Sequence, residues 1–171
     1  MIHLREIRES DLPYFLKWRN DKSLNRYFRT GWHALTVIDE ARWFEGLAGD
    51  GKQAMFAIEE SWEGSNAGPA IVVGCAGLTS IDWFERAAEV SLYIGDNYID
   101  ARAEEALKHL ASIAFLGYNL HRLWCEVWAF DDKKQEILKA CDFAHEGTHA
   151  KAHWYNGSWH DSVWYGLVNK G

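Results

Sequence analysis

The hydrophobic pattern is clearest between residues 88 and 117, where its period changes from two residues to about 3.6. Apolar and polar residues first alternate, which predicts a strand over residues 88–95. Apolar residues then recur at helical spacing, so that they share one face, and this predicts a helix from about Ala103 to Gly117. A strand that leads directly into a helix aims free backbone N–H groups at the turn, which suits an anionic group such as pyrophosphate. An ordinary strand–helix connection has the same pattern, so this stretch alone leaves both interpretations open.

Similar alternation elsewhere predicts the other strands, and the last two form a hairpin across Asn156-Gly157, the strongest short turn signal in the chain. Residues 64–69, rich in Gly, Ser, Asn and Pro, predict a second hairpin loop. The strands are expected over residues 2–7, 54–58, 71–78, 122–129, 149–155 and 158–168.

Capping residues mark where the other helices begin. Ser10 is expected to cap a first helix that has Pro13 in its first turn. Thr36 and Asp39 form a capping box for a second helix, and Asp131 caps a short one after the strand at 122–129. The resulting order of elements predicts a single α/β domain over residues 1–171, with a mixed sheet of about seven strands and flanking helices.

Composition excludes several classes of protein. The chain has 171 residues, of which 48% are hydrophobic, and this balance supports a sizeable core. A net charge of −7 argues against an extended nucleic-acid-binding surface. No apolar run is long enough to span a bilayer, and the first residues lack the apolar core of a signal peptide, so no membrane association is expected.

Three residue types add detail. Cys75, Cys125 and Cys141 are scattered and odd in number, as in reduced thiols of a cytoplasmic protein. The ten tryptophans exceed what a core needs and suggest an aromatic-lined cleft as well. His149 and His153 have the interval of a helical metal site but lie on a predicted strand, so no zinc site is expected.

The order of these elements, with residues spread over nearly the whole chain, resembles the GNAT superfamily of acyl-CoA-dependent N-acyltransferases, and in particular the branch of ribosomal-protein N-terminal acetyltransferases. The resemblance rests on Leu4-Arg5, Asp11-Leu12, Trp18-Arg19-Asn20-Asp21, Tyr27, Val73-Gly74, Gly77-Leu78, Ala88-Glu89, Ile94-Gly95-Asp96, Glu105-Ala106-Leu107, Leu120-His121-Arg122, Glu146-Gly147, Tyr155-Asn156-Gly157 and His160-Asp161.

This resemblance implies an acetyl-CoA cleft between the fourth and fifth strands, residues 88–95 and 122–129. The acceptor would be a primary amine of a small molecule or of a protein N-terminus. The sequence does not decide the oligomeric state, and a homodimer is one expectation. Family members hold acyl-CoA with the fourth strand and the loop after it, here Leu92, Tyr93, Ile94, Ile99, Asp100, Ala101, Arg102, Ala103 and Glu104, and with Asp131 at the start of the short helix.

Four positions of the acyl-CoA site depart from the family pattern, namely Tyr98, Ala101, Asp131 and Leu138. The family's pyrophosphate loop has Gln or Arg, two residues, Gly, one residue, then Gly or Ala, whereas residues 98–103 here are Tyr-Ile-Asp-Ala-Arg-Ala. Asp131 replaces the usual Asn, and Leu138 replaces a Tyr that protonates the departing thiolate. Two hypotheses follow: an N-acetyltransferase, or a GNAT-fold protein that has lost acetyl-CoA chemistry and serves as a binding module or uses another donor.

Glu89 is the main candidate for a general base, because amine acylation requires removal of a proton from an ammonium group. An ion-paired strand glutamate is the alternative interpretation. His160, beside Asp161, is the second candidate. The residues expected to bind the acceptor are Arg19, Asn20, Tyr27 and Ser91, although helix termination or local hydrogen bonding also accounts for the first three.

Overall fold

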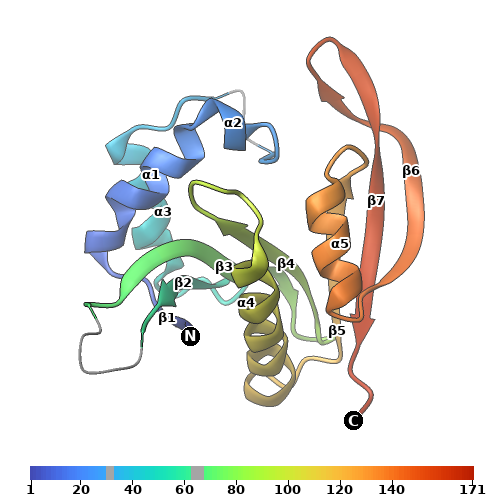
Figure 1. Cartoon of the computed structure of the whole chain (residues 1–171). Coiled ribbons are helices and arrows are strands. Elements are labelled where there is room, and N and C mark those ends of the chain that lie inside the picture. Colours follow the sequence, from blue (N-terminus) through green and yellow to red (C-terminus); the bar gives the residue numbers. More distant parts are fainter. Residues whose placement is uncertain (30–32, 63–67) are drawn as a thin grey trace.

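The strands form one seven-stranded mixed sheet in the order β1-β2-β3-β4-β5-β7-β6 in the computed structural model of the chain, which describes residues 1–29, 33–62 and 68–171 (Figure 1). All neighbours are antiparallel except β4 and β5, which are parallel. The strands are β1 (Ile2–Glu6), β2 (Ala54–Glu60), β3 (Ile71–Asp82), β4 (Ala87–Ile94), β5 (Arg122–Trp128), β6 (Ala144–Tyr155) and β7 (Ser158–Val168). This confirms the predicted α/β fold class and the central place of β4.

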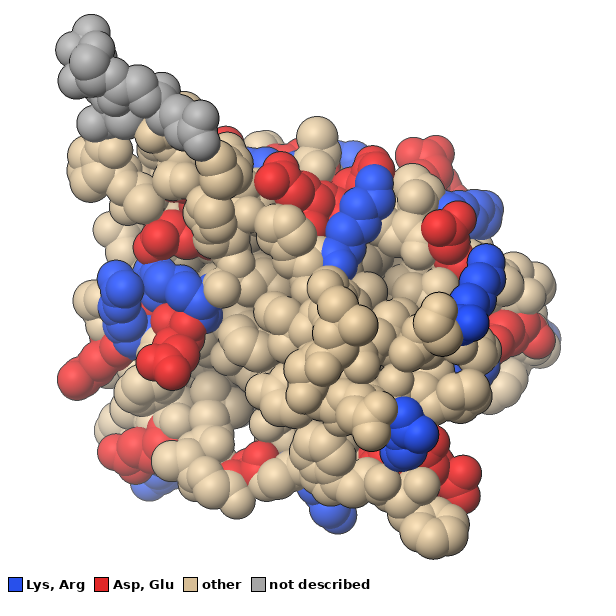
Figure 2. All heavy atoms as spheres, turned by 90° about the horizontal axis from the view of Figure 1, so that it is seen from below, with Lys and Arg blue, Asp and Glu red and all other residues tan. Residues whose placement is uncertain are grey.

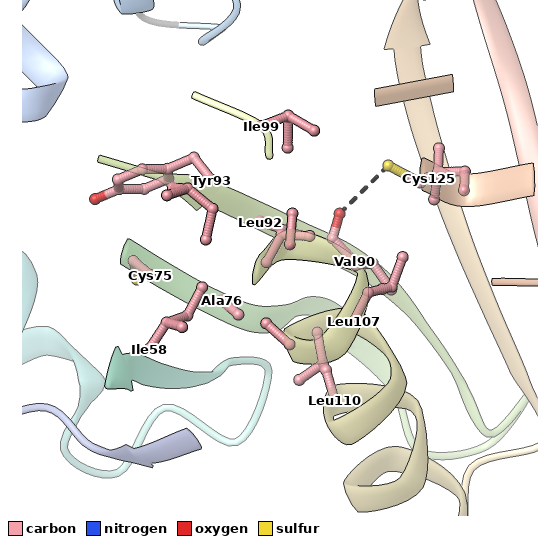
Figure 3. Close-up of a cluster of buried hydrophobic side chains, with 14 of the residues drawn as sticks. Ile58, Cys75, Ala76, Val90, Leu92, Tyr93, Ile99, Leu107, Leu110 and Cys125 are labelled. Carbon is pink, nitrogen blue, oxygen red and sulfur yellow. Dashed lines mark hydrogen bonds between the residues drawn. The ribbon is translucent and has the colours of Figure 1, made fainter. Parts of the chain in front are cut away.

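Helices cover both faces of this sheet (Figure 1). Even-numbered residues of β4 pack with Leu107 and Leu110 of α4, as Figure 3 shows for Val90 and Leu92. On the other face, the Tyr93 ring meets Trp18 of α1 edge to face, with the centroids 6.4 Å apart. The helices are α1 (Leu12–Asn20), α2 (Lys22–Asn25), α3 (Val37–Leu47), α4 (Ala101–Ser112) and α5 (Asp132–Ala140), with a 3-10 turn at Glu9–Asp11 and a π-helical turn at Ile113–Gly117.

The central feature is the separation of β4 from β5. Their parallel pairing covers only Ala87–Glu89 on β4 and Arg122–Trp124 on β5. Beyond these residues the two strands diverge, and the sheet opens at the carboxyl ends of its one parallel pair. Ligands of open α/β sheets bind at such ends.

Most local predictions are confirmed, with small shifts. The Thr36–Asp39 capping box is present, and Asp131 caps α5 by accepting from Lys134 N at 3.2 Å. The final hairpin turns at Asn156-Gly157 as predicted, although β6 begins at Ala144 rather than at 149. The hairpin loop predicted at 64–69 falls mostly on residues 63–67, outside the described residues.

Two predicted boundaries were wrong. Ser10 does not cap α1; it lies in a 3-10 turn, and Asp11 precedes the helix because its carboxylate accepts from Arg8 N (2.8 Å) and pairs with Arg5 (2.7 Å). The helix expected from Ala103 begins two residues earlier, because Asp100 caps it.

Candidate active site

A cavity of about 300 Å³ lies where β4 and β5 separate. Its walls include odd-numbered residues of β3 and β4, the even-numbered Glu126 and Trp128 of β5, and the segments around residues 27–29 and 98. Trp43, Trp128, Tyr27, Phe28, Tyr93 and Tyr98 supply the aromatic wall that the tryptophan content suggested. The charged residues that line it are Arg19, Arg29, Glu40, Glu89, Glu126, Asp131 and Lys134.

The edge of β4 that faces β5 carries backbone groups beyond the paired region. The Cys125 thiol donates to the Val90 carbonyl at 3.5 Å (Figure 3), and Ile94 N donates to the Tyr98 carbonyl at 2.6 Å. Because backbone groups of alternate strand residues point to the same edge, those of Leu92 face β5 as well. In the described part of the chain, pairing of β4 with β5 stops at Glu89, so Leu92 offers its N–H and C=O to an extended, amide-bearing chain.

Glu89 lies at the last paired position of β4, and its side chain lines the cavity with 16% of its surface exposed. Its Oε1 accepts from Arg29 Nη2 at 2.8 Å, and its Oε2 accepts from Thr79 Oγ1 at 3.3 Å. The general-base candidate therefore lies at the cavity, and it is also ion-paired with Arg29, as the alternative interpretation expected.

Glu126 is a cavity residue that sequence reasoning missed. It lies on β5, its Oε2 accepts from the same Arg29 Nη2 at 2.8 Å, and its Oε1 accepts from Ser162 Oγ at 2.6 Å. A signal was present, because Glu126 alternates with the buried Cys125 and Val127 and so shares a face with Glu89.

The acceptor candidates divide into two groups. Arg19, Tyr27 and Ser91 line the cavity, whereas Asn20 bonds both backbone groups of Leu35 at 2.8 Å and so fastens the loop that precedes α3. Arg19 lies 3.6 Å from Glu40, whose carboxylate is buried beneath the cavity. Burial raises the pKa of Glu40 above its ordinary value, while the charge of Arg19 acts in the opposite direction.

His160 lies on β7 beside the Phe130 ring, with a centroid distance of 5.1 Å, and is outside the cavity lining. Its Nε2 contacts Ser158 Oγ at 3.0 Å. Asp161 accepts from Lys151 N at 2.7 Å, so its carboxylate is committed to the hairpin. The structure thus places Glu89, rather than His160, at the cavity.

In the loop predicted to hold pyrophosphate, the charged side chains of Asp100 and Arg102 pair with each other. Asp100 Oδ1 accepts from Arg102 N at 2.9 Å, at the start of α4. The Arg102 guanidinium pairs with Asp100 at 2.6 Å and with Glu60 at 3.2 Å. Partial burial acts to raise the pKa of Asp100, but hydrogen bonds from Arg102 outweigh it and lower that pKa. Ile99, Ala101, Ala103 and Glu104 complete the segment, in which Ile99 and Ala103 are buried.

Tyr98 points into the gap between β4 and β5. Its ring stacks on Tyr27 with a centroid distance of 3.9 Å, and its hydroxyl donates to Asp131 Oδ2 at 2.5 Å. Burial raises the pKa of Tyr98 well above its ordinary value, so the phenol stays protonated. Leu138 is buried in the core, and its side chain has no proton to donate.

Two general features bear on the class of site. The described residues contain no cluster of three or more metal-ligating side chains, and none of their helices is long and apolar enough to cross a membrane. Figure 2 shows basic and acidic side chains interspersed over the face seen from below, with no large patch of one sign on that face.

The mixed sheet thus opens between two parallel strands, with unpaired backbone on the edge of β4 and the Glu89 carboxylate where the strands separate, and this arrangement suits a ligand with an extended, amide-bearing chain. Residues 2–144 match the family model described as the Acetyltransferase (GNAT) domain. The chain belongs to this family of acetyl-CoA-dependent N-acetyltransferases.

Similar proteins include the spermidine N(1)-acetyltransferase of Vibrio cholerae serotype O1 (strain ATCC 39315 / El Tor Inaba N16961), which is 20% identical over 160 residues, 92% of this chain and 87% of the relative. The crystal structure of spermidine N-acetyltransferase from Vibrio cholerae in complex with CoA and spermine has a TM-score of 0.84 at 19% identity, covering 98% of this chain and 95% of that one. A dodecameric structure of the same enzyme has a TM-score of 0.77 at 19% identity, covering 98% and 93%. At these identities the structural likeness shows the fold.

Proposed function

We propose that this protein transfers the acetyl group of acetyl-CoA to a primary amine of a small cationic molecule, with a polyamine as the favoured acceptor class. The observation that carries the proposal is the place of Glu89: a carboxylate in the cavity, at the last pair before the β4 edge becomes free. The names of the similar proteins support a polyamine over a protein N-terminus.

On the donor side, the residues fit an acyl-CoA in part. The free edge of β4 at Leu92, with Tyr93 and Ile94 beside it, suits the amide-bearing arm, and Asp131 lies across the gap at the start of α5. The phosphate end would lie on residues 99–104, where backbone N–H groups at the start of α4 favour an anion but Asp100 opposes one. Acetyl-CoA, when bound, supplies the acetyl group as a thioester.

On the acceptor side, Glu89 is the proton acceptor. Glu89 takes one proton from the bound ammonium, and the neutral amine then attacks the thioester carbonyl. The C–N bond forms as the C–S bond breaks, and the second proton lost by nitrogen passes to the released thiolate. Arg19, Tyr27 and Ser91 are proposed to contact the acceptor, Asn20 to hold the loop above it, and His160 remains the second candidate for the base.

We also propose that the protein works in the cytoplasm, because its three cysteines are unpaired and buried. A similar protein forms a dodecamer, and we propose self-association here too, with a homodimer as the smallest unit.

An assay of free CoA thiol release tests the proposal with three acceptors: spermidine, a monoamine such as propylamine, and a peptide with a free N-terminus. We expect release with spermidine, less with propylamine and least with the peptide. Absence of release with every amine, together with no rise in melting temperature on addition of acetyl-CoA, would favour the binding-module hypothesis.

A further inference from the structure

One nitrogen atom of Arg29 connects two strands across the opening in the sheet. Its Nη2 donates to Glu89 Oε1 on β4 and to Glu126 Oε2 on β5, at 2.8 Å in each case. The ring of Trp128 forms a third wall, with the Arg29 Cζ atom 5.8 Å from its centroid. A single cationic nitrogen is thus bound by two carboxylates beside an aromatic face.

The two carboxylates have further partners that hold them in place independently of Arg29. Glu126 accepts from Ser162, which is fully buried, and Glu89 accepts from Thr79, its direct cross-strand neighbour. The exposed fractions of the Glu89 and Glu126 side chains are 16% and 13%, whereas that of Arg29 is 53%. The two carboxylates therefore form part of the cavity wall, whereas the Arg29 side chain, from the segment after α2, is half exposed.

Two nearby carboxylates repel each other unless a cation lies between them. A primary ammonium can take the place of the Arg29 nitrogen, because its three N–H donors can bond both carboxylates and leave one over. The side chain of Arg29 therefore marks where a cationic acceptor would put its reactive nitrogen.

We propose that Glu89 and Glu126 form a dicarboxylate site for the ammonium of the acceptor, that Glu126 binds and positions it, and that Arg29 occupies the site until the acceptor displaces it. This rests on the proposed function and adds the chemical class of the group that is recognised. Amines that are protonated at neutral pH are substrates, whereas aromatic amines, which are neutral there, are poor ones.

Glu126→Gln tests the positioning role, because glutamine keeps the oxygen that accepts from Ser162 but loses the charge. Loss of one hydrogen bond to a charged group predicts a rise of about 10- to 100-fold in the KM for spermidine. We expect kcat and the KM for acetyl-CoA to change by less than about threefold, since binding of the acceptor is what is lost. Glu146→Gln is the matched control, because Glu146 pairs with Arg122 outside the cavity and its loss should leave KM unchanged.

Arg29→Met tests the occupancy of the site and has a readout that needs no turnover. With the guanidinium removed, methylguanidinium should bind between the two carboxylates, raise the melting temperature of this variant and compete with spermidine. In Arg29→Met combined with Glu126→Gln the stabilisation should disappear. The Arg29→Met measurement also decides the matter if Glu126→Gln fails to fold.

The outcomes separate the two proposals. An unchanged spermidine KM in folded Glu126→Gln, or no effect of methylguanidinium on Arg29→Met, would overturn the dicarboxylate site while amine acetylation by the wild type stands. If the wild type acetylates no amine but methylguanidinium stabilises Arg29→Met through Glu126, the dicarboxylate site stands and the proposed function falls.

Discussion

The hydroxyl of Tyr98 donates a hydrogen bond to the carboxylate of Asp131, 2.5 Å away, and so joins the loop after β4 to the start of α5. Both residues are buried. Tyr98 and Asp131 are also two of the positions at which the sequence departs from the pattern of its family, so two of the substituted residues contact each other. An acid in place of an amide at 131 is accommodated by a phenol at 98 that remains protonated.

Asp131→Asn should stabilise the protein at neutral pH. Burial raises the pKa of Asp131, although the hydrogen bond from Tyr98 acts in the opposite direction. Since the folded state favours the protonated acid, the stability this group contributes is present below the ordinary pKa of about 4 and is lost as the pH rises through the folded value. Asparagine can still cap α5 and bond to Tyr98. We therefore expect a higher melting temperature than wild type at pH 7, with the difference shrinking towards pH 4; a lower one at both values would contradict this.

Asp100→Asn should strengthen the binding of acetyl-CoA. Asparagine can still cap α4, but the change removes a negative charge from the proposed phosphate site and frees Arg102 from its pairing at 2.6 Å. One exposed charge pair is worth up to about 1 kcal/mol, so the Kd measured by calorimetry should fall by about two- to fivefold and more at low salt. Acetyl-pantetheine, which lacks the diphosphate, is the control and should bind both proteins equally. An equal gain for both ligands would place the phosphates elsewhere.

The thiols should be inert in the folded protein. Burial raises the pKa of Cys75 to about 12 and that of Cys141 to about 11, and it also raises the pKa of Cys125. The thiolate is the reactive form, so iodoacetamide at pH 8 should label the native protein slowly and all three cysteines rapidly in denaturant. Mass spectrometry over a time course measures this, and rapid labelling of one cysteine in the native protein would contradict the burial.

The parts of the fold that sequence reasoning found are those with a local cause. The alternation in β4, the capping box at Thr36 and the Asn156-Gly157 turn depend on residues within a few positions of one another. Ser10 was wrongly taken as a cap because Asp11 is held by Arg5, a residue of β1, and that competition is tertiary.

The candidate site shows the same division. Glu89 was found because it alternates with apolar neighbours on the strand that organises the sheet. Arg29 lies 60 residues from Glu89 and 97 residues from Glu126 in the sequence, and no local periodicity connects Arg29 to either carboxylate. Which polar positions of two strands face one cavity depends on where the strands diverge, and this follows from packing around the opening.

The most direct test of the account is the initial rate of spermidine acetylation by wild type and Glu89→Gln as a function of pH. General-base catalysis is typically worth about 10²- to 10⁴-fold, so kcat of the variant should fall by that factor at pH 7. Much of the loss should return at high pH, where the amine arrives already deprotonated. A variant that keeps the wild-type kcat at pH 7 would contradict the account, and a parallel loss in His160→Gln would then move the base to His160.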